Sequence, residues 1–316
     1  HIVKNNGIKV GFTSSDGIYV DNYLMEKGDT TGPISACYIL KDPTVEFAIL
    51  ETARGGILRS GLGFSSCDMA IITNIKEDHL GLDDIETLAD LAKVKAVVVE
   101  SVKREGWAIV NADDAYCMQI AQSLNCNVAY FSLDENNPKV LELSKKGKIV
   151  AVSENGFITI KKGEWKIRIE KILKVPLTLE GRARFMIQNV LAATLAGYLC
   201  GFKPEDISVS LQTFFPSPTQ TPGRINIFEF SKFKIMVDFA HNPAGYLAIE
   251  DFLSFVSATK KIGIIAGVGD RRDEDIIECG KIASRMFDHI IIRQENHLRG
   301  RTEQEIIDLL LEGINS

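Results

Sequence analysis

Short apolar runs recur along the chain, and each of them ends in a cluster of polar or charged residues. Runs of this length without a polar interruption are typical of strands that are buried on both faces. The runs, with the polar residues that follow them, are 45–50 (Glu51), 69–73 (Asn74 and His79), 107–110 (Asn111, Asp113 and Asp114), 235–237 (Asp238 and His241), 262–266 (Gly269 and Asp270) and 290–292 (Arg293).

Segments with a helical spacing of apolar residues lie between these runs. They predict helices at 85–104, 182–200, 244–257, 273–286 and 302–312. At the start of the chain, "HIVKNNGIKVGFT" indicates the end of a helix, a glycine cap and then a strand. Alternating strands and helices predict an α/β fold whose parallel sheet is covered by helices.

Two segments interrupt this alternation. Residues 134–175 are rich in Lys, Glu and Gly with short alternating strands, which predicts an antiparallel excursion within the first domain. The stretch "FFPSPTQTPGR" at 214–224 contains three prolines, and a helix cannot continue through it. We therefore predict two domains, at 1–220 and 221–316.

The polar clusters lie where ligands bind in open parallel sheets, beyond the carboxyl ends of the strands. Any single cluster is explained equally well by a strand-end turn or a helix cap. Because the clusters recur at several strand ends, they favour a functional site.

The helix predicted after the 69–73 run contains two lysines with different environments. On a helical projection, Lys95 lies within the apolar stripe, while Lys93 points away from it. A lysine on a buried stripe is costly unless it is partnered, chemically modified or extended to solvent. Together with Glu51 and His79, a Lys95 that carries a carbamate would suit a divalent cation.

Composition narrows the classes of function. The chain of 316 residues has 36 basic and 42 acidic residues and a net charge of −6, which gives no electrostatic reason to expect a nucleic-acid or anionic-membrane partner. The six cysteines form no C-x-x-C pair, so neither a zinc site nor a disulfide framework is indicated. With no signal peptide or membrane span in the pattern, we expect a soluble cytoplasmic protein.

Eight motifs in order resemble the Mur ligase family, and the resemblance runs from about residue 8 to the end. "ETARGGILRSGLGF" (51–64) is nearly a signature, whereas "NADD" (111–114) alone is weak. The others are "TNIKEDHLGL" (73–82), "LAKVKAVVVE" (91–100), "GRARFMIQNVLAA" (181–193), "TPGRIN" (221–226), "DFAHNP" (238–243) and "GDRRDEDI" (269–276).

The resemblance implies a central parallel-sheet domain followed by a smaller Rossmann-like α/β domain. It also implies an ATP- and Mg²⁺-dependent amide ligase, in which ATP converts a carboxylate into an acyl phosphate that an amine then attacks. The motifs look closest to the branch of the family that joins arginine to the side-chain carboxylates of a poly-aspartate backbone. The expected partners are therefore an amino acid, with arginine suspected, and an acidic polypeptide primer. The sequence leaves the oligomeric state open.

Individual roles follow from the same resemblance. Glu51 and His79 match the family's magnesium-associated carboxylate and histidine, and Lys95 matches its often carbamylated lysine, which makes these three the candidate catalytic residues. The candidate nucleotide-binding residues, which match family positions that contact the base, ribose and phosphates of ATP, are Asn189, Arg224, Asp238 and His241.

Simpler interpretations stand beside these roles. Arg224 is also explained as a solvated linker charge, and Asp238 with His241 as a turn stabilised by an aspartate. Asp270 is followed by an acidic residue three positions later, which equally predicts a helix N-cap.

The sequence departs from the family pattern in two ways. Phe185 and Met186 stand where many members carry His-Asn, so we expect a differently built adenine pocket. No G-x-x-x-x-G-K-[ST] phosphate loop occurs, and we expect the chain to begin after it and to end before the family's last domain does. On this basis the chain alone is expected to bind ATP weakly and not to ligate arginine.

The alternative is a non-catalytic assembly module, while a Rossmann oxidoreductase is disfavoured because no G-x-G-x-x-G opens a βαβ unit.

Overall fold

The computed structural model describes residues 1–77, 80–294 and 298–316. The chain forms two units, one made of residues 1–75, 92–181 and 186–216, and the other of residues 76–91, 182–185 and 217–316. The sequence-based division into 1–220 and 221–316 stays a prediction, and two short segments, 76–91 and 182–185, group here with the later part of the chain.

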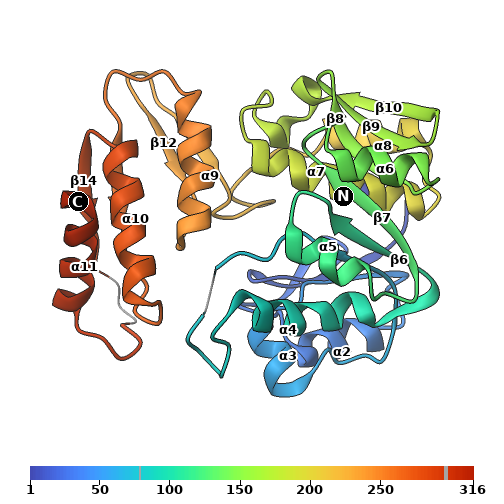
Figure 1. Ribbon diagram of the computed structural model, residues 1–316, viewed down its shortest axis with the longest axis horizontal. Coiled ribbons are helices and arrows are strands. Elements are labelled where there is room, and N and C mark those ends of the chain that lie inside the picture. The colour runs from blue at the N-terminus through green and yellow to red at the C-terminus, as the bar shows by residue number, and fades with distance from the viewer. Residues whose placement is uncertain (78–79, 295–297) are drawn as a thin grey trace. The chain divides into compact units, whose positions relative to one another are not determined.

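A six-stranded mixed sheet is the centre of the first unit (Figure 1). Its order is β10-β9-β8-β7-β6-β5, in which β5 to β8 run parallel and β8, β9 and β10 form an antiparallel meander. This arrangement confirms the α/β fold and the antiparallel excursion. The strands are β5 (Cys67–Ile72), β6 (Val102–Asn111), β7 (Asn127–Ser132), β8 (Val150–Glu154), β9 (Phe157–Lys162) and β10 (Trp165–Lys171).

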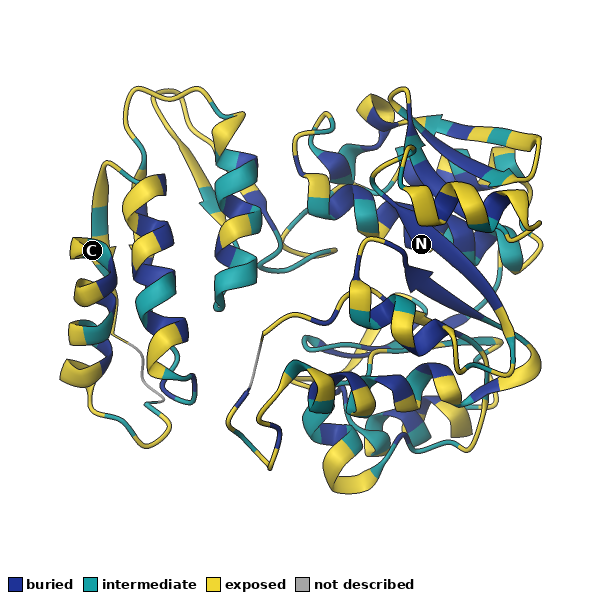
Figure 2. Ribbon diagram, viewed as in Figure 1, coloured by how far each residue is buried: buried dark blue, intermediate teal, exposed yellow. Residues whose placement is uncertain are grey.

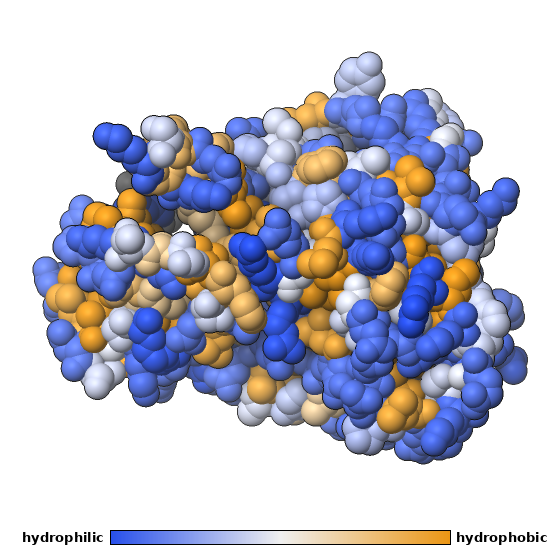
Figure 3. Space-filling view, turned by 90° about the horizontal axis from the view of Figure 1, so that it is seen from above, coloured by the Kyte–Doolittle hydropathy of each residue, from blue (hydrophilic) through white to orange (hydrophobic). Residues whose placement is uncertain are grey.

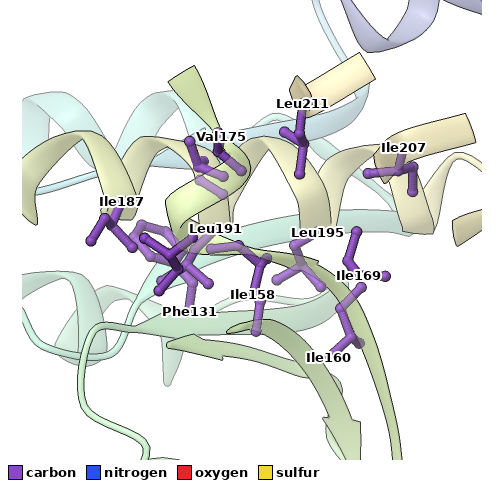
Figure 4. Close-up of a cluster of buried hydrophobic side chains, with 14 of the residues drawn as sticks. Phe131, Ile158, Ile160, Ile169, Val175, Ile187, Leu191, Leu195, Ile207 and Leu211 are labelled. Carbon is purple, nitrogen blue, oxygen red and sulfur yellow. The ribbon is translucent and has the colours of Figure 1, made fainter. Parts of the chain in front are cut away.

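The main hydrophobic core lies between this sheet and two helices, α7 (Arg184–Leu199) and α8 (Pro204–Gln212). Figure 4 shows Leu191 and Leu195 of α7 pointing toward Phe131 and Ile158 of the sheet. All four side chains are at most 1% exposed, so burial of apolar area holds these layers together. Figure 2 shows the inner strands of this sheet as almost continuously buried.

A second, four-stranded sheet has the order β3-β2-β1-β4, with β1 and β4 parallel. Its strands are β1 (Val10–Thr13), β2 (Gly17–Val20), β3 (Tyr23–Lys27) and β4 (Phe47–Leu50). Helices α2 (Pro33–Lys41) and α3 (Arg54–Ser60) follow β3 and β4 along the chain. The strand that precedes Glu51 pairs in parallel with β1 and belongs to this separate sheet, so the apolar runs of the first unit fall into two sheets.

The start of the chain agrees with its sequence pattern. A short helix, α1 (Ile2–Asn5), ends before Gly7, whose φ of +78° is the left-handed conformation that favours glycine, and β1 follows. Two further helices of this unit are α5 (Ala115–Ala121) and α6 (Pro138–Lys145).

Helix α4 (Leu88–Glu100) is shorter than the predicted segment 85–104. The Thr87 hydroxyl accepts a hydrogen bond from the Asp90 backbone N–H at 3.2 Å, which caps the first turn. At the other end the chain enters β6 at Val102, because residues from there on pair with β5. Of the predicted apolar stripe, Leu91, Ala92 and Val99 are buried, whereas Leu88 and Val98 are only partly buried.

The second unit contains two separate two-stranded sheets, antiparallel β11-β12 and parallel β13-β14. Their strands are β11 (Asn226–Glu229), β12 (Lys234–Val237), β13 (Ile262–Ile265) and β14 (His289–Ile292), and the helices are α9 (Pro243–Ser254), α10 (Asp273–Met286) and α11 (Glu303–Asn315). Helices α10 and α11 pack side by side at glycines (Figure 1). A Cβ atom at Gly313 would lie 1.9 Å from the Ile277 carbonyl oxygen, so only glycine allows this approach.

The expected burial of strands on both faces holds for only part of the chain. Strands β6, β7 and β8 are largely buried, whereas Ile262, Ile264 and Ile291 of the small β13-β14 sheet are 55%, 68% and 45% exposed. Only the opposite face, with Gly263 and Ile265, is buried. Figure 3 shows groups of apolar residues among hydrophilic ones on the face in view. Within the described residues, no helix combines the length and apolar character that a membrane crossing requires.

The core at α7 predicts a large difference between two identical substitutions. Leu191→Ala removes a fully buried side chain and is expected to lower the free energy of unfolding by about 2–5 kcal/mol. Leu173→Ala, at a side chain that is 69% exposed, should change it by no more than about 0.5 kcal/mol. Urea unfolding followed by circular dichroism measures both, and equal effects would contradict the assigned core.

Candidate functional site

A pocket of about 240 Å³ lies in the second unit, where β12 passes into α9. The loop between these elements carries Asp238 and His241, and Asn242 caps α9 by accepting the Gly245 backbone N–H at 2.8 Å. The residues that line the pocket include Phe185, Arg224, Asp238, Phe239, His241 and Asn242. Three of the four predicted nucleotide-binding residues therefore meet in one pocket.

The Asp238 carboxylate organises two backbone segments of this pocket. One oxygen accepts the Ala240 backbone N–H at 2.8 Å, which closes a tight turn, and the other accepts the Ile225 backbone N–H at 2.9 Å. Ile225 has a φ of +46°, a left-handed conformation that is strained for a β-branched residue. Asp238 thus holds the strained backbone that directly follows Arg224. Asp238 also stabilises a turn, as the simpler interpretation of the sequence expected. The sequence analysis missed the supporting role of Ile225, which is buried and bonded to Asp238 through its backbone.

Arg224 and His241 both lie against the Phe239 ring. The Arg224 guanidinium carbon is 4.9 Å from the ring centroid, a cation–π distance, and the His241 ring meets Phe239 edge-on with centroids 5.2 Å apart. His241 Nδ1 lies 2.8 Å from the Phe239 carbonyl oxygen. Because a carbonyl only accepts hydrogen bonds, this contact places the proton on Nδ1 and makes Nε2 the acceptor nitrogen of the neutral ring.

At the end of β4, Glu51 is tied to the end of β1. Its carboxylate accepts the Ser15 backbone N–H at 3.3 Å, and its own N–H donates to the Thr13 carbonyl at 3.2 Å. The carboxylate is exposed. The parallel pairing of β1 with β4 causes this meeting, because the carboxyl ends of both strands lie at one edge.

A neighbouring loop joins the same edge, and the sequence analysis missed it. The Thr30 hydroxyl donates to the Ser14 carbonyl at 2.7 Å, and the Thr31 hydroxyl donates to the Asp29 carboxylate at 2.7 Å. Both threonines are buried. Hydroxyl-rich stretches at "TSSD" (13–16) and "DTT" (29–31) were the available signal, since neither belongs to an apolar run.

Lys95 lies near the end of β5. Its ammonium nitrogen is 3.5 Å from the Asn74 carbonyl oxygen, and its side chain is half-buried, whereas Lys93 on the same helix is exposed. The contrast agrees with the helical projection. A 3.5 Å contact is a long hydrogen bond, so it orients Lys95 without holding it tightly.

Two predicted site residues remain. His79 lies outside the described residues. Asn189 of α7 is exposed, and its amide nitrogen is 3.6 Å from the Met186 sulfur. Among residues 1–77, 80–294 and 298–316, no three or more His, Cys, Asp or Glu side chains group in a way that could hold a metal ion.

The N-cap interpretation of Asp270 is wrong. Helix α10 begins at Asp273 with Arg272 at its N-cap position. Asp270 instead forms ion pairs with Arg271, at 2.7 Å, and with Arg299. Nearby, Asp275 and Glu77 both bind Arg272, and these hydrogen bonds raise the pKa of its guanidinium. Asp270 and Asp275 are thus paired with the chain's own arginines.

Two family models match the chain. The "Mur ligase middle domain" covers residues 1–197, and the "Mur ligase, glutamate ligase domain" covers residues 223–315. The cyanophycin synthetase of Geminocystis herdmanii is 49% identical over 99% of the chain, and that of Crocosphaera subtropica is 48% identical over 100%. The chain spans 36% of the length of each of these relatives. The UDP-N-acetylmuramoyl-L-alanyl-D-glutamate–2,6-diaminopimelate ligase of Bacteroides fragilis is 25% identical over 98% of the chain and 60% of its own length.

Solved structures share the fold at low sequence identity. The Escherichia coli FolC structure in complex with ADP has a TM-score of 0.69 and 17% identity, and the match covers 98% of this chain and 74% of FolC. A UDP-N-acetylmuramoyl-L-alanyl-D-glutamate–2,6-diaminopimelate ligase has a TM-score of 0.60 and 18% identity over 99% of this chain and 61% of the ligase. These similarities confirm the two-part α/β fold.

The His241 contact generates a spectroscopic prediction. We expect long-range ¹H–¹⁵N NMR spectra to show the neutral His241 ring protonated at Nδ1, because that nitrogen donates to the Phe239 carbonyl. His289, an exposed histidine of β14, provides the internal reference. Protonation of His241 at Nε2 instead would contradict the assigned geometry.

Proposed function

Because the chain belongs to the Mur ligase family, we propose that it contributes the middle and C-terminal domains of an ATP-dependent amide ligase. The pocket of Arg224, Phe239, Asp238 and His241 is the observation that carries this proposal. A nucleotide needs an aromatic or apolar surface for its base, an acceptor for ribose hydroxyls and a cation for phosphate. These residues offer each of those groups.

Phe185, which departs from the family pattern, also lines this pocket. This ring lines the pocket where many family members carry a histidine, so the adenine would meet a wholly apolar surface on that side. Asn189 is proposed as a further nucleotide contact. A FolC structure of the same fold was solved with ADP, which supports a nucleotide as the ligand.

Glu51, His79 and Lys95 are proposed for the phosphoryl-transfer side of the reaction. Mg²⁺ binds proteins through one or two carboxylates and keeps water and phosphate oxygens as its other ligands, so an exposed carboxylate such as Glu51 fits it. When bound, the ion would neutralise charge between the triphosphate and an attacking carboxylate. The ammonium group of Lys95, or a carbamate formed on its nitrogen, would point toward that charge.

We propose arginine and the side-chain carboxylates of a poly-aspartate backbone as the substrates. The support is the 46–49% identity with cyanophycin synthetases, compared with 25% for the diaminopimelate ligase of Bacteroides fragilis. In this reaction the aspartate carboxylate displaces ADP from the γ-phosphoryl group and forms an acyl phosphate. The arginine α-amine then attacks the acyl carbon, releases phosphate and loses a proton as the amide forms.

A chimera tests the proposed function. In the cyanophycin synthetase of Geminocystis herdmanii, the segment that matches this chain is replaced by the chain, and the product is called the ligase chimera. We expect arginine-dependent release of ADP and phosphate, one of each per arginine joined to a poly-aspartate primer. The same protein with lysine in place of arginine is the substrate control. Release of AMP, or turnover that is independent of arginine, would reject the proposal.

The two lysines of α4 give a matched pair of variants in the ligase chimera. Lys95→Ala is expected to lower the rate of arginine ligation by about 10²–10³-fold, the range for removal of a group that stabilises developing charge. Lys93→Ala, at an exposed position, should leave the rate within about twofold. An inactive Lys93→Ala beside a fully active Lys95→Ala would reverse the assignment.

A further inference from the structure

The motif "NADD" at 111–114 begins with the last residue of β6, and two of its side chains bond to the segment that follows the neighbouring strand β5. Asn111 is 2% exposed, and its amide N–H₂ donates to the Thr73 carbonyl at 2.7 Å. Its amide oxygen accepts the Asp113 backbone N–H at 2.9 Å. With both ends bonded, the Asn111 side chain fixes the residue immediately after β5.

Asp114 holds the next part of the same segment. It is 4% exposed, and one carboxylate oxygen accepts the Ile75 backbone N–H at 3.1 Å while the other caps α5 by accepting the Cys117 N–H at 3.0 Å. Ile75 itself is 2% exposed. Hydrogen bonds to a carboxylate are stronger than those between neutral groups, so Asp114 holds the Ile75 backbone N–H firmly.

Asn74 lies between these two fixed residues, and its carbonyl oxygen is the group that Lys95 approaches at 3.5 Å. The hydrogen bonds from Asn111 to Thr73 and from Ile75 to Asp114 leave Asn74 little freedom, because buried side chains hold its neighbours on both sides. Asn111 and Asp114 therefore set the position of the Asn74 carbonyl, a group that Lys95 approaches.

We propose that Asn111 and Asp114 are positioning residues for ligation, which orient Lys95 through the Asn74 carbonyl. The proposal rests on the proposed function, in which Lys95 serves phosphoryl transfer. Neither side chain acts on substrate: each holds one backbone group of residues 73–75.

Asp113 provides a control within the same motif. Its carboxylate accepts the Ser132 hydroxyl at 2.5 Å, the Leu133 backbone N–H at 2.8 Å and the Asn137 side-chain N–H₂ at 3.0 Å. These bonds connect the motif to β7 and to the start of α6, and none of them reaches residues 73–75. Asp113→Asn is thus the same isosteric change as Asp114→Asn, one residue away. It affects hydrogen bonds to β7 and to the start of α6, and none to residues 73–75.

The first test uses the chain alone. Asp114→Asn keeps one acceptor oxygen, so the substituted side chain cannot accept both the Ile75 and Cys117 N–H groups. We expect hydrogen exchange at the Ile75 amide to accelerate by about tenfold or more, and amine-directed labelling of Lys95, relative to Lys93, to change by more than about twofold. Asn111→Asp, which cannot donate to the Thr73 carbonyl, should change Lys95 labelling in the same way. Asp113→Asn should leave both readouts at their wild-type values.

The second test uses the ligase chimera. Asp114→Asn is expected to lower kcat on the order of 10- to 100-fold, the range for a catalytic group displaced by about an ångström, with KM for arginine within about threefold. Asp113→Asn should keep most of the wild-type kcat.

If Asp114→Asn frees the Ile75 amide but leaves Lys95 labelling and kcat unchanged, or if Asp113→Asn is equally impaired, the residues are merely structural and the inference is wrong. If the unsubstituted ligase chimera does not ligate, the proposed function fails, while the measurements on the chain alone still decide whether Lys95 is positioned from the motif.

Discussion

The parallel pairing of β5, β6 and β7 is the constraint on which the first unit depends. Parallel neighbours cannot be joined by a tight turn, so helices α4 and α5 must return the chain between them, and all three strands then end at one edge. This places residues 73–75, the "NADD" motif and the end of β7 next to one another. The irregularity that lengthens β6 also needs a glycine, since a Cβ at Gly106 would lie 2.4 Å from the Asp68 carbonyl oxygen.

At two strand ends, an aspartate side chain holds backbone groups of neighbouring segments in place. Asp114 and Asp238 have parallel roles in the two units: each follows a strand closely, and each accepts backbone N–H groups from two different segments. The Asp114 carboxylate, at 4% exposed, needs several donors to offset its lost hydration, and backbone N–H groups supply them. Arg224, which is proposed to contact the nucleotide, directly precedes Ile225, whose backbone N–H Asp238 accepts.

Much of the fold could be predicted because the signals involved are local. The apolar periodicity of residues 273–286 predicts the bounds of α10, and the helical projection of α4 separates half-buried Lys95 from exposed Lys93. Both patterns depend only on helix geometry, because side chains of an α-helix return to the same face about every 3.6 residues. In the same way, the prolines and glycines of 134–175 and 214–224 predicted breaks in the regular alternation.

The sequence by itself therefore determined the type of most elements, the family resemblance and a set of candidate site residues. Tertiary structure alone decided that β4 pairs with β1 in a sheet of its own, that Asp238 supports the strained backbone of Ile225, and that Asp270 binds arginines rather than capping α10. The physical reason is the range of the interactions. Periodicity and propensity act within a few residues, whereas strand partners and the acceptors of buried N–H groups are chosen among segments far apart in the chain.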